Sequence, residues 1–231
     1  MEDTQMQQTA EMSDGTETAA EEAEGTAAPQ KKTSLFNEVV EILESMLVPA
    51  FVILLLFSYL MRPVTVDGRS MVPTLHDQDR LLMFRLFYTP EQGDIVVVSD
   101  YGGNVLDENG NAMPSGYSLD ENLIKRVIAV EGQKIEVRSS EGAVYVDDVR
   151  LDEPYINELT MTDDGAFIYP ITIPEGYVFV MGDNRNHSTD SRSVSVGLIK
   201  VENVLGKAYF RYRSMPDTVE GLPKGKIGFL D

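Results

Sequence analysis

An uncharged apolar segment, Met46–Met61, separates two parts of this chain that differ sharply in composition. With the flanking turn from Ile42 it is about 20 residues long, roughly 30 Å of helix, which matches the hydrocarbon core of a bilayer. A secretory signal peptide would begin with a short basic region, whereas an acidic stretch precedes this segment. A buried core helix is the other alternative, because glutamates lie at its edge and Pro49 lies within it. We expect residues 41–61 to form a transmembrane anchor.

Residues 1–40 consist mainly of Glu, Asp, Ala, Thr, Gln and Gly, so burial of apolar groups cannot offset the entropy lost on ordering. We expect a disordered acidic tail, with a partner-binding arm as the alternative. Lys31 and Lys32 precede the anchor, and Arg62 and Arg69 follow it. Because these charges nearly balance, the positive-inside rule does not decide the orientation.

Residues 62–231 have the pattern of a mainly β domain. Short runs rich in Val, Ile, Phe and Tyr are separated by Gly, Asp, Asn and Pro, as strands are separated by turns. We predict an antiparallel β-sheet catalytic domain with inserted loops, preceded by one N-terminal transmembrane helix. The insertions are an exposed loop at 100–121 and a second at 139–170 that starts with a hairpin. The predicted strands are 63–66, 80–84, 94–99, 123–130, 134–137, 143–146, 177–181 and 207–212.

Charge and residue types disfavour several classes of function. A formal net charge of −19 argues against nucleic acid as a partner, because phosphates require a surface rich in Lys and Arg. Without cysteine there is no thiol nucleophile and no thiolate-bound metal. The two histidines, His76 and His187, lack metal-ligand spacing, so we predict neither a metal site nor a cofactor.

A serine at a tight turn is the candidate nucleophile. In the run VDGRSMVP, residues 66–73, Gly68 permits a positive φ and Pro73 restricts the chain that follows. Ser70 is thereby held on an exposed turn with its backbone N–H able to face a ligand. Because an ordinary surface turn fits the same run, this interpretation requires a partner base.

The candidate base lies in the run LIKRVIAVEG, residues 123–132. Strand alternation places Lys125 and Arg126 on opposite faces, so one of these cations must lie among apolar groups. Burial can lower the pKa of a lysine by several units, whereas arginine stays protonated. Only Lys125 can therefore be a base at neutral pH; the alternative is an edge strand from which it reaches solvent.

A polar run, GDNRNHSTDSR at residues 182–192, follows the predicted strand 177–181. So many polar groups after a core strand must hydrogen-bond one another if they are buried. Ser188 could orient a lysine amine, and Asp190 with Arg192 could form a bidentate pair. A polar surface loop is the alternative.

Together these runs resemble the bacterial type I signal peptidases, with a Gram-positive-like pattern. These are membrane-bound Ser–Lys proteases that remove signal peptides from exported proteins. The resemblance covers Glu38 to about Arg213 through VDGRSMVPTL, DRLLM, GDIVVV, LIKRVIAVEG and GDNRNHSTDSR, in the order of the family. It implies that Ser70 is the nucleophile, Lys125 the general base and Ser188 the residue that positions the lysine.

The resemblance also implies supporting roles. Asp190 and Arg192 would form the supporting ion pair, and the site would be framed by Gly182, Asp183, Asn184 and Arg185. Many relatives have a serine of the oxyanion hole where this chain has Gly68, which leaves the second oxyanion donor unassigned. Met71 is expected to contact substrate, or, with residues 84–88, to rest on the bilayer, and a core position for these residues is the alternative.

The implied activity is cleavage after small side chains, typically Ala, with the substrate bound as an extended strand. The implied partners are signal peptides of exported preproteins and the lipid bilayer. The implied location is the bacterial cytoplasmic membrane, with a single span, residues 1–40 in the cytoplasm and residues 62–231 outside. The alternatives are a Ser70/His187/Asp190 triad protease, a non-catalytic anchored β domain that binds substrate or assists assembly, and a self-cleaving repressor.

Overall fold

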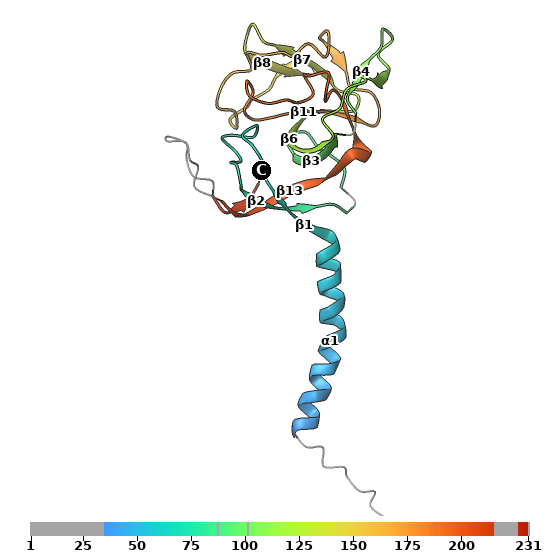
Figure 1. Ribbon diagram of the computed structural model, residues 1–231, viewed down its shortest axis with the longest axis vertical. Helices are drawn as coiled ribbons and strands as arrows, with labels where there is room; N and C mark the ends of the chain where they lie inside the picture. Colours follow the sequence, from blue (N-terminus) through green and yellow to red (C-terminus); the bar gives the residue numbers. More distant parts are fainter. Residues whose placement is uncertain (1–34, 87, 101, 215–225, 231) are drawn as a thin grey trace, which may run out of the picture. The chain divides into compact units, whose positions relative to one another are not determined.

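The computed structural model describes residues 35–214, apart from 87 and 101, and residues 226–230 (Figure 1). The expected tail at residues 1–34 lies outside this part of the chain. Packing divides the chain into two compact units, Met1–Leu47 and Val48–Asp231.

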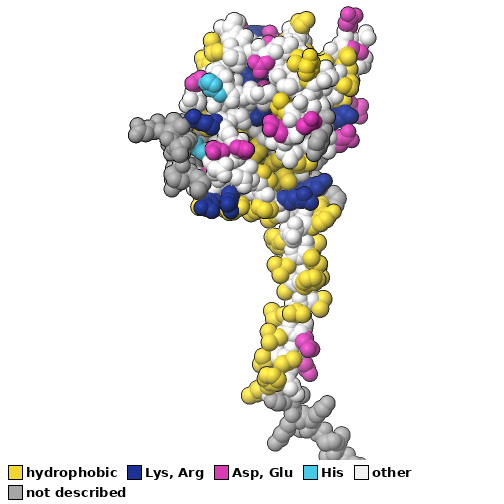
Figure 2. All heavy atoms as spheres, viewed as in Figure 1, with side chains coloured by type: hydrophobic (Ala, Val, Ile, Leu, Met, Phe, Trp, Pro, Cys, Tyr) yellow, Lys and Arg dark blue, Asp and Glu magenta, His cyan; other side chains and the backbone are white. Residues whose placement is uncertain are grey.

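Helix α1, Leu35–Leu60, is long and apolar enough to cross a membrane, the one such helix among the described residues. It contains Pro49, and none of its residues is buried, which disfavours a soluble core helix. Figure 2 shows hydrophobic side chains along its visible face. The helix starts before the expected boundary at residue 41, so residues 35–40 are helical rather than part of a tail. Glu38 lies in the first turn, where a carboxylate interacts favourably with the helix dipole.

The remaining fold is antiparallel β structure, as predicted. The main sheet has the strand order β1 (Met61–Thr65), β2 (Arg80–Phe84), β13 (Val204–Arg213), β3 (Ile95–Asp100), β6 (Glu121–Val130), β11 (Tyr177–Met181) and β12 (Ile199–Lys200), and β14 (Gly228–Phe229) pairs with β13. A second sheet has the order β10 (Ile171–Thr172), β7 (Lys134–Arg138), β8 (Ala143–Val146) and β9 (Val149–Arg150). A short 3-10 helix, η1 (Val201–Asn203), precedes β13.

All eight predicted strands are present, with small differences at their ends. The prediction for residues 100–121 was wrong in one respect, because this loop contains a hairpin of β4 (Asn104–Leu106) and β5 (Ala112–Pro114). The hairpin is closed by Asp107, whose Oδ1 accepts hydrogen bonds from the backbone N–H groups of Asn109 and Asn111. The hairpin predicted at the start of the second insertion is formed by β8 and β9.

The described residues form three clusters of buried apolar side chains, and one of these clusters packs against the predicted nucleophile turn. This cluster joins the turn to strands of the main sheet and to the last described residue, through Val66, Met71, Leu75, Leu81, Ile95, Ala208 and Leu230. The core thus holds the turn in place through these apolar contacts.

Candidate active site

The turn that carries Ser70 is fixed by backbone and side-chain contacts. Gly68 has a φ of +87°, a conformation that favours glycine, and its N–H donates to Asp77 Oδ1 at 2.9 Å. The carbonyl oxygen of Ser70 accepts a 2.9 Å hydrogen bond from the N–H of Asn184. Within the described residues the N–H of Ser70 makes no hydrogen bond, so it is available to a ligand.

Lys125 points from β6 to this turn, and its Nζ lies 2.8 Å from Ser70 Oγ. Its side chain is only 3% exposed, and it makes no ion pair with any described residue. Burial lowers the pKa of Lys125 from 10.5, while the charges of Asp190 and Glu121 act in the opposite direction. A neutral amine within hydrogen-bonding distance of a serine hydroxyl is the geometry that proton abstraction requires.

Arg126 is buried as well, so both cations of this strand lie inside the protein. Its guanidinium binds Asp183 through two hydrogen bonds of 2.9 and 2.8 Å and lies over the ring of Tyr155. Asp183 Oδ2 also accepts from the hydroxyl of Thr74 at 2.5 Å. This buried ion pair therefore links the strand of the base to the turn of the nucleophile.

The predicted bidentate pair of Asp190 and Arg192 is present and buried. Arg192 Nε and Nη2 donate to the two carboxylate oxygens at 2.8 Å each. Asp190 Oδ2 also accepts from the N–H of Gly182. Arg192 Nη2 donates in addition to the carbonyl oxygen of Arg185. These contacts tie the two ends of the polar run together.

Arg185 is buried and contacts the same run. Its Nη1 lies 2.6 Å from Glu153 Oε1, and its Nε donates to the carbonyl oxygen of Gly182. Burial raises the pKa of Glu153, and the charge of Arg185 opposes this rise. Arg185 thus contacts the frame of the site and not Ser70 or Lys125.

Ser188 does not make the predicted hydrogen bond to Lys125. Its Oγ is buried and has no partner among the described residues. It lies beside Gly182, where a Cβ atom would collide with Ser188 and with the carbonyl oxygen of Ser70. Ser188 is therefore at the site, and its role in positioning the lysine remains a prediction.

The alternative triad is not assembled. His187 is exposed, and its backbone N–H donates to the carbonyl oxygen of Asn184. The carboxylate of Asp190 is occupied by Arg192 and by the N–H of Gly182. No hydrogen bond joins the His187 imidazole to Ser70 or Asp190 in the described part of the chain.

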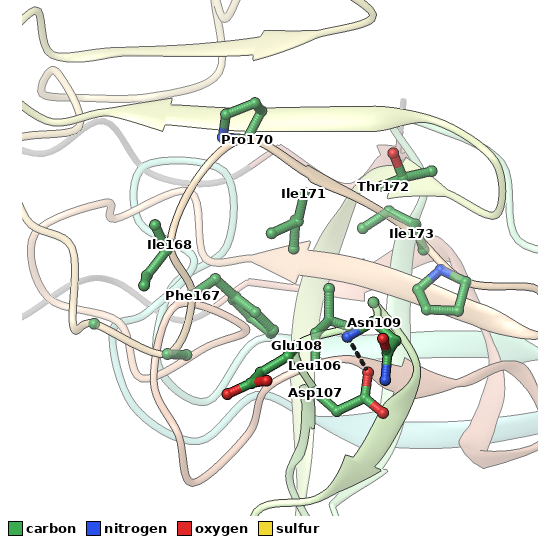
Figure 3. Close-up of a pocket in the computed structure, with 14 residues that line it drawn as sticks. Leu106, Asp107, Glu108, Asn109, Phe167, Ile168, Pro170, Ile171, Thr172 and Ile173 are labelled. Carbon is green, nitrogen blue, oxygen red and sulfur yellow. Dashed lines mark hydrogen bonds between the residues drawn. The ribbon is translucent and has the colours of Figure 1, made fainter.

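Ser70 and Lys125 share a cleft of about 600 Å³. Met71 also lines it but is only 1% exposed, so this residue packs in the core and does not rest on a bilayer. A larger cavity of about 850 Å³ lies elsewhere, between the β4–β5 turn and residues 165–174, and Phe167, Ile171 and Ile173 point into it (Figure 3). No serine or lysine lines that cavity, so the smaller cleft is the candidate active site.

Two contacts of the site were not predicted from the sequence. Thr74 binds Asp183 through its side chain, and Asn184 holds the turn by donating to the carbonyl oxygens of Ser70 and Arg69. Asn184 was expected to frame the site, but nothing in the spacing of the polar run indicated that it binds the nucleophile turn.

The fold and site define a membrane-associated β hydrolase with a serine and a buried lysine in one cleft. Comparison with known proteins gives the family. The model of the family described as "Signal peptidase, peptidase S26" matches residues 39–213, and the chain belongs to this family of serine endopeptidases.

Three similar proteins carry related names. "Probable signal peptidase I" of Mycobacterium leprae is 34% identical, with 83% of this chain and 81% of the relative covered. "Probable signal peptidase I-1" of Synechocystis sp. is 36% identical over 75% of this chain and 82% of the relative. "Signal peptidase I" of Bacillus licheniformis is 31% identical over 78% and 92%. The resemblance inferred from the sequence motifs is thereby confirmed, and these relatives together with helix α1 indicate membrane anchoring.

Proposed function

We propose that this chain removes signal peptides from exported preproteins, with Ser70 as nucleophile and Lys125 as general base. The observation that carries this assignment is the 2.8 Å contact between Ser70 Oγ and Lys125 Nζ in a buried setting. Arg126, the neighbouring cation, cannot serve, because its guanidinium is paired with Asp183 and stays protonated.

The reaction follows from this geometry. Neutral Lys125 takes the proton of the Ser70 hydroxyl while Oγ bonds to the carbonyl carbon of the substrate, and the Ser70 N–H stabilises the oxyanion. The C–N bond then breaks as Lys125 passes its proton to the leaving amine. Water, activated by the amine of Lys125, then hydrolyses the acyl-enzyme and releases the serine.

An open strand edge supports binding of the substrate as an extended chain. On one side Glu121–Arg126 of β6 pairs with β3, whereas on the other side β11 pairs with β6 only from Arg126 onward. The free edge of residues 121–125 faces the cleft, where an extended peptide can add as a strand. Apolar residues contribute to the cleft lining beside its polar groups, which suits small apolar side chains; these residues are Val64, Val66, Val97, Leu123 and Ile124.

We further propose a single span, with residues 1–40 in the cytoplasm and residues 62–231 on the outer face of the cytoplasmic membrane. Exposed side chains on and beside strands β2, β13 and β14 support contact with lipid headgroups. Aromatic and apolar groups there are accompanied by exposed arginines on the same strands, a combination favoured at membrane interfaces. These residues are Arg80, Phe84, Tyr209, Tyr212, Arg213, Ile227 and Phe229.

Cleavage of a preprotein by the full chain in detergent micelles tests the proposed function. Wild type should release the signal peptide, whereas Ser70→Ala and Lys125→Ala should not. His187→Ala should retain cleavage, and loss of activity in this variant with activity in Lys125→Ala would favour the triad. An inert wild type that still binds the preprotein would favour the non-catalytic alternative.

Because the chain has no cysteine, a single introduced thiol reports the orientation. Ser140→Cys lies at an exposed position between β7 and β8. A membrane-impermeant maleimide should label it in intact bacterial protoplasts. Labelling that requires lysis would contradict an outer location.

A further inference from the structure

A second cavity, of about 370 Å³, adjoins the active-site cleft. The two share the lining residues Arg69 and His187, and the second is otherwise lined by Val72, Asn157, Glu158 and Asn184. We call this second cavity the outer pocket. Asn184 places it directly against the nucleophile turn, because its Nδ2 and N–H donate to the carbonyl oxygens of Arg69 and Ser70.

The path of a bound peptide leads from the cleft toward the outer pocket. A chain that lies along the free edge of residues 121–125 cannot continue beside β6, because β11 occupies that edge from Arg126 onward. At Ser70 the peptide must therefore turn away from the sheet. Arg69 and His187 line both cavities, so the outer pocket adjoins the cleft at these two residues.

Two charged residues, Arg69 and Glu158, line the outer pocket, and they differ in whether they already have a partner. Arg69 is exposed, and its guanidinium makes no ion pair with any described residue. Glu158 lines only the outer pocket, and its Oε2 already accepts a 3.0 Å hydrogen bond from Asn186 Nδ2. A peptide that leaves Ser70 thus meets an unpaired cation before it meets this carboxylate.

We propose that the outer pocket binds the first residues after the cleavage site and that Arg69 favours a carboxylate side chain at the first or second of them. This inference rests on the proposed function. It extends that function to the part of the substrate that follows the cleavage site and is released with a new amino terminus. Arg69 is thus a specificity-determining residue that contacts substrate beside the nucleophile.

The test uses synthetic signal-peptide substrates and the full chain in detergent micelles. Ala, Asp or Lys is placed at the first or the second position after the cut, and kcat/KM is measured for each. Wild type should favour Asp over Lys by about fivefold at one or both positions, the effect of a partly exposed ion pair. The preference should shrink toward one in 1 M salt, where screening acts over about 3 Å.

Two substitutions at Arg69 should change this ratio in a graded way. Arg69→Gln should bring the ratio of Asp to Lys near one, and Arg69→Glu should reverse it. Arg150→Glu on exposed β9 makes the same change in net charge and should keep the wild-type ratio. If Arg69→Glu is too inactive to measure, Arg69→Gln alone decides.

The outcomes separate this inference from the function on which it rests. Cleavage of the Ala substrate with a ratio that no Arg69 variant alters, or that Arg150→Glu alters equally, would overturn the role of Arg69 alone. Failure of wild type to cut any of these substrates would overturn the proposed function and this inference together.

Discussion

Lys125 Nζ lies 2.8 Å from Ser70 Oγ, although the two residues are 55 positions apart in the sequence. Strand β6 runs through the centre of the main sheet and places the lysine, while the turn after β1 places the serine. The amine is buried and makes no ion pair with a carboxylate among the described residues, so its neutral form is favoured. The sheet thus turns an ordinary lysine into a base suited to proton abstraction.

The first prediction concerns the pH dependence of cleavage. Activity should rise with pH as Lys125 loses its proton, with a midpoint below the ordinary lysine value of 10.5, because burial lowers its pKa. The measurement is kcat/KM as a function of pH on the Ala substrate. A midpoint at or above 10.5 would contradict this effect of burial.

Glu121→Gln and Glu108→Gln form a matched pair of variants for this pH profile. The charge of Glu121 raises the pKa of Lys125, so Glu121→Gln should move the midpoint to lower pH. Glu108→Gln, an exposed change in the β4–β5 turn, should leave the midpoint where it is. Equal shifts in both variants would indicate a general effect of net charge.

The second prediction concerns stability. Between the lowered pKa of folded Lys125 and 10.5, the unfolded chain holds a proton that the folded chain lacks, so wild-type stability rises with pH across this window. Below the window the folded state buries a charged amine, and Lys125→Met should be more stable. Its advantage should be about 1.4 kcal/mol for each unit of pKa lowering and should shrink as pH rises through the window.

Urea unfolding of wild type and Lys125→Met at several pH values measures this difference. Lys134→Met, on a partly exposed lysine paired with Asp148, is the control and should show no such trend. A Lys125→Met advantage that grows with pH would contradict a lowered pKa.

The third prediction concerns Ser188, whose buried hydroxyl has no hydrogen-bond partner among the described residues. If it positions Lys125 during the reaction, Ser188→Ala should lower kcat by about ten- to a hundredfold, part of the roughly 10²–10⁴-fold that a positioned base supplies. Stability should change little, because no hydrogen bond is lost. Unchanged kcat and an unchanged pH profile would show that Ser188 does not position the lysine.

The sequence predicted the strands because these depend on local signals, whereas the pairing of Ser70 with Lys125 was implied by the resemblance of the ordered motifs to the family. Runs of β-branched residues ended by turn residues marked the strands, and alternation placed Lys125 and Arg126 on opposite faces. Alternation alone could not show that both faces of β6 are buried, because this depends on β7, β8 and the polar run folding over the second face. The burial of Arg126 required a partner, Asp183, which lies 57 positions away.

Other features were beyond local patterns. The β4–β5 hairpin has only three residues in each strand, too few for a periodic signal. Met71 follows the nucleophile in an exposed-looking turn, yet its side chain is drawn into the core by Leu75 and Leu81. The role of Asn184 depends on a contact between two loops that no spacing encodes.

The last prediction tests the ion pair between Arg126 and Asp183. Asp183→Ala would remove the carboxylate that accepts two hydrogen bonds from the buried Arg126 guanidinium, which should reduce the free energy of unfolding by about 3–5 kcal/mol. Because Asp183 also accepts from Thr74 in the nucleophile turn, kcat should fall under conditions where the variant remains folded. Urea unfolding and cleavage of the Ala substrate measure the two effects.

The exposed Asp163 gives the control, since Asp163→Ala should alter neither quantity. In the double variant Arg126→Met/Asp183→Ala no uncompensated charge remains, so the loss of stability should be smaller than the sum of the two single losses. Cleavage should nevertheless stay low, because the link from β6 to Thr74 is still missing. A double variant that regains wild-type kcat would show that the pair serves stability alone and does not position the nucleophile turn.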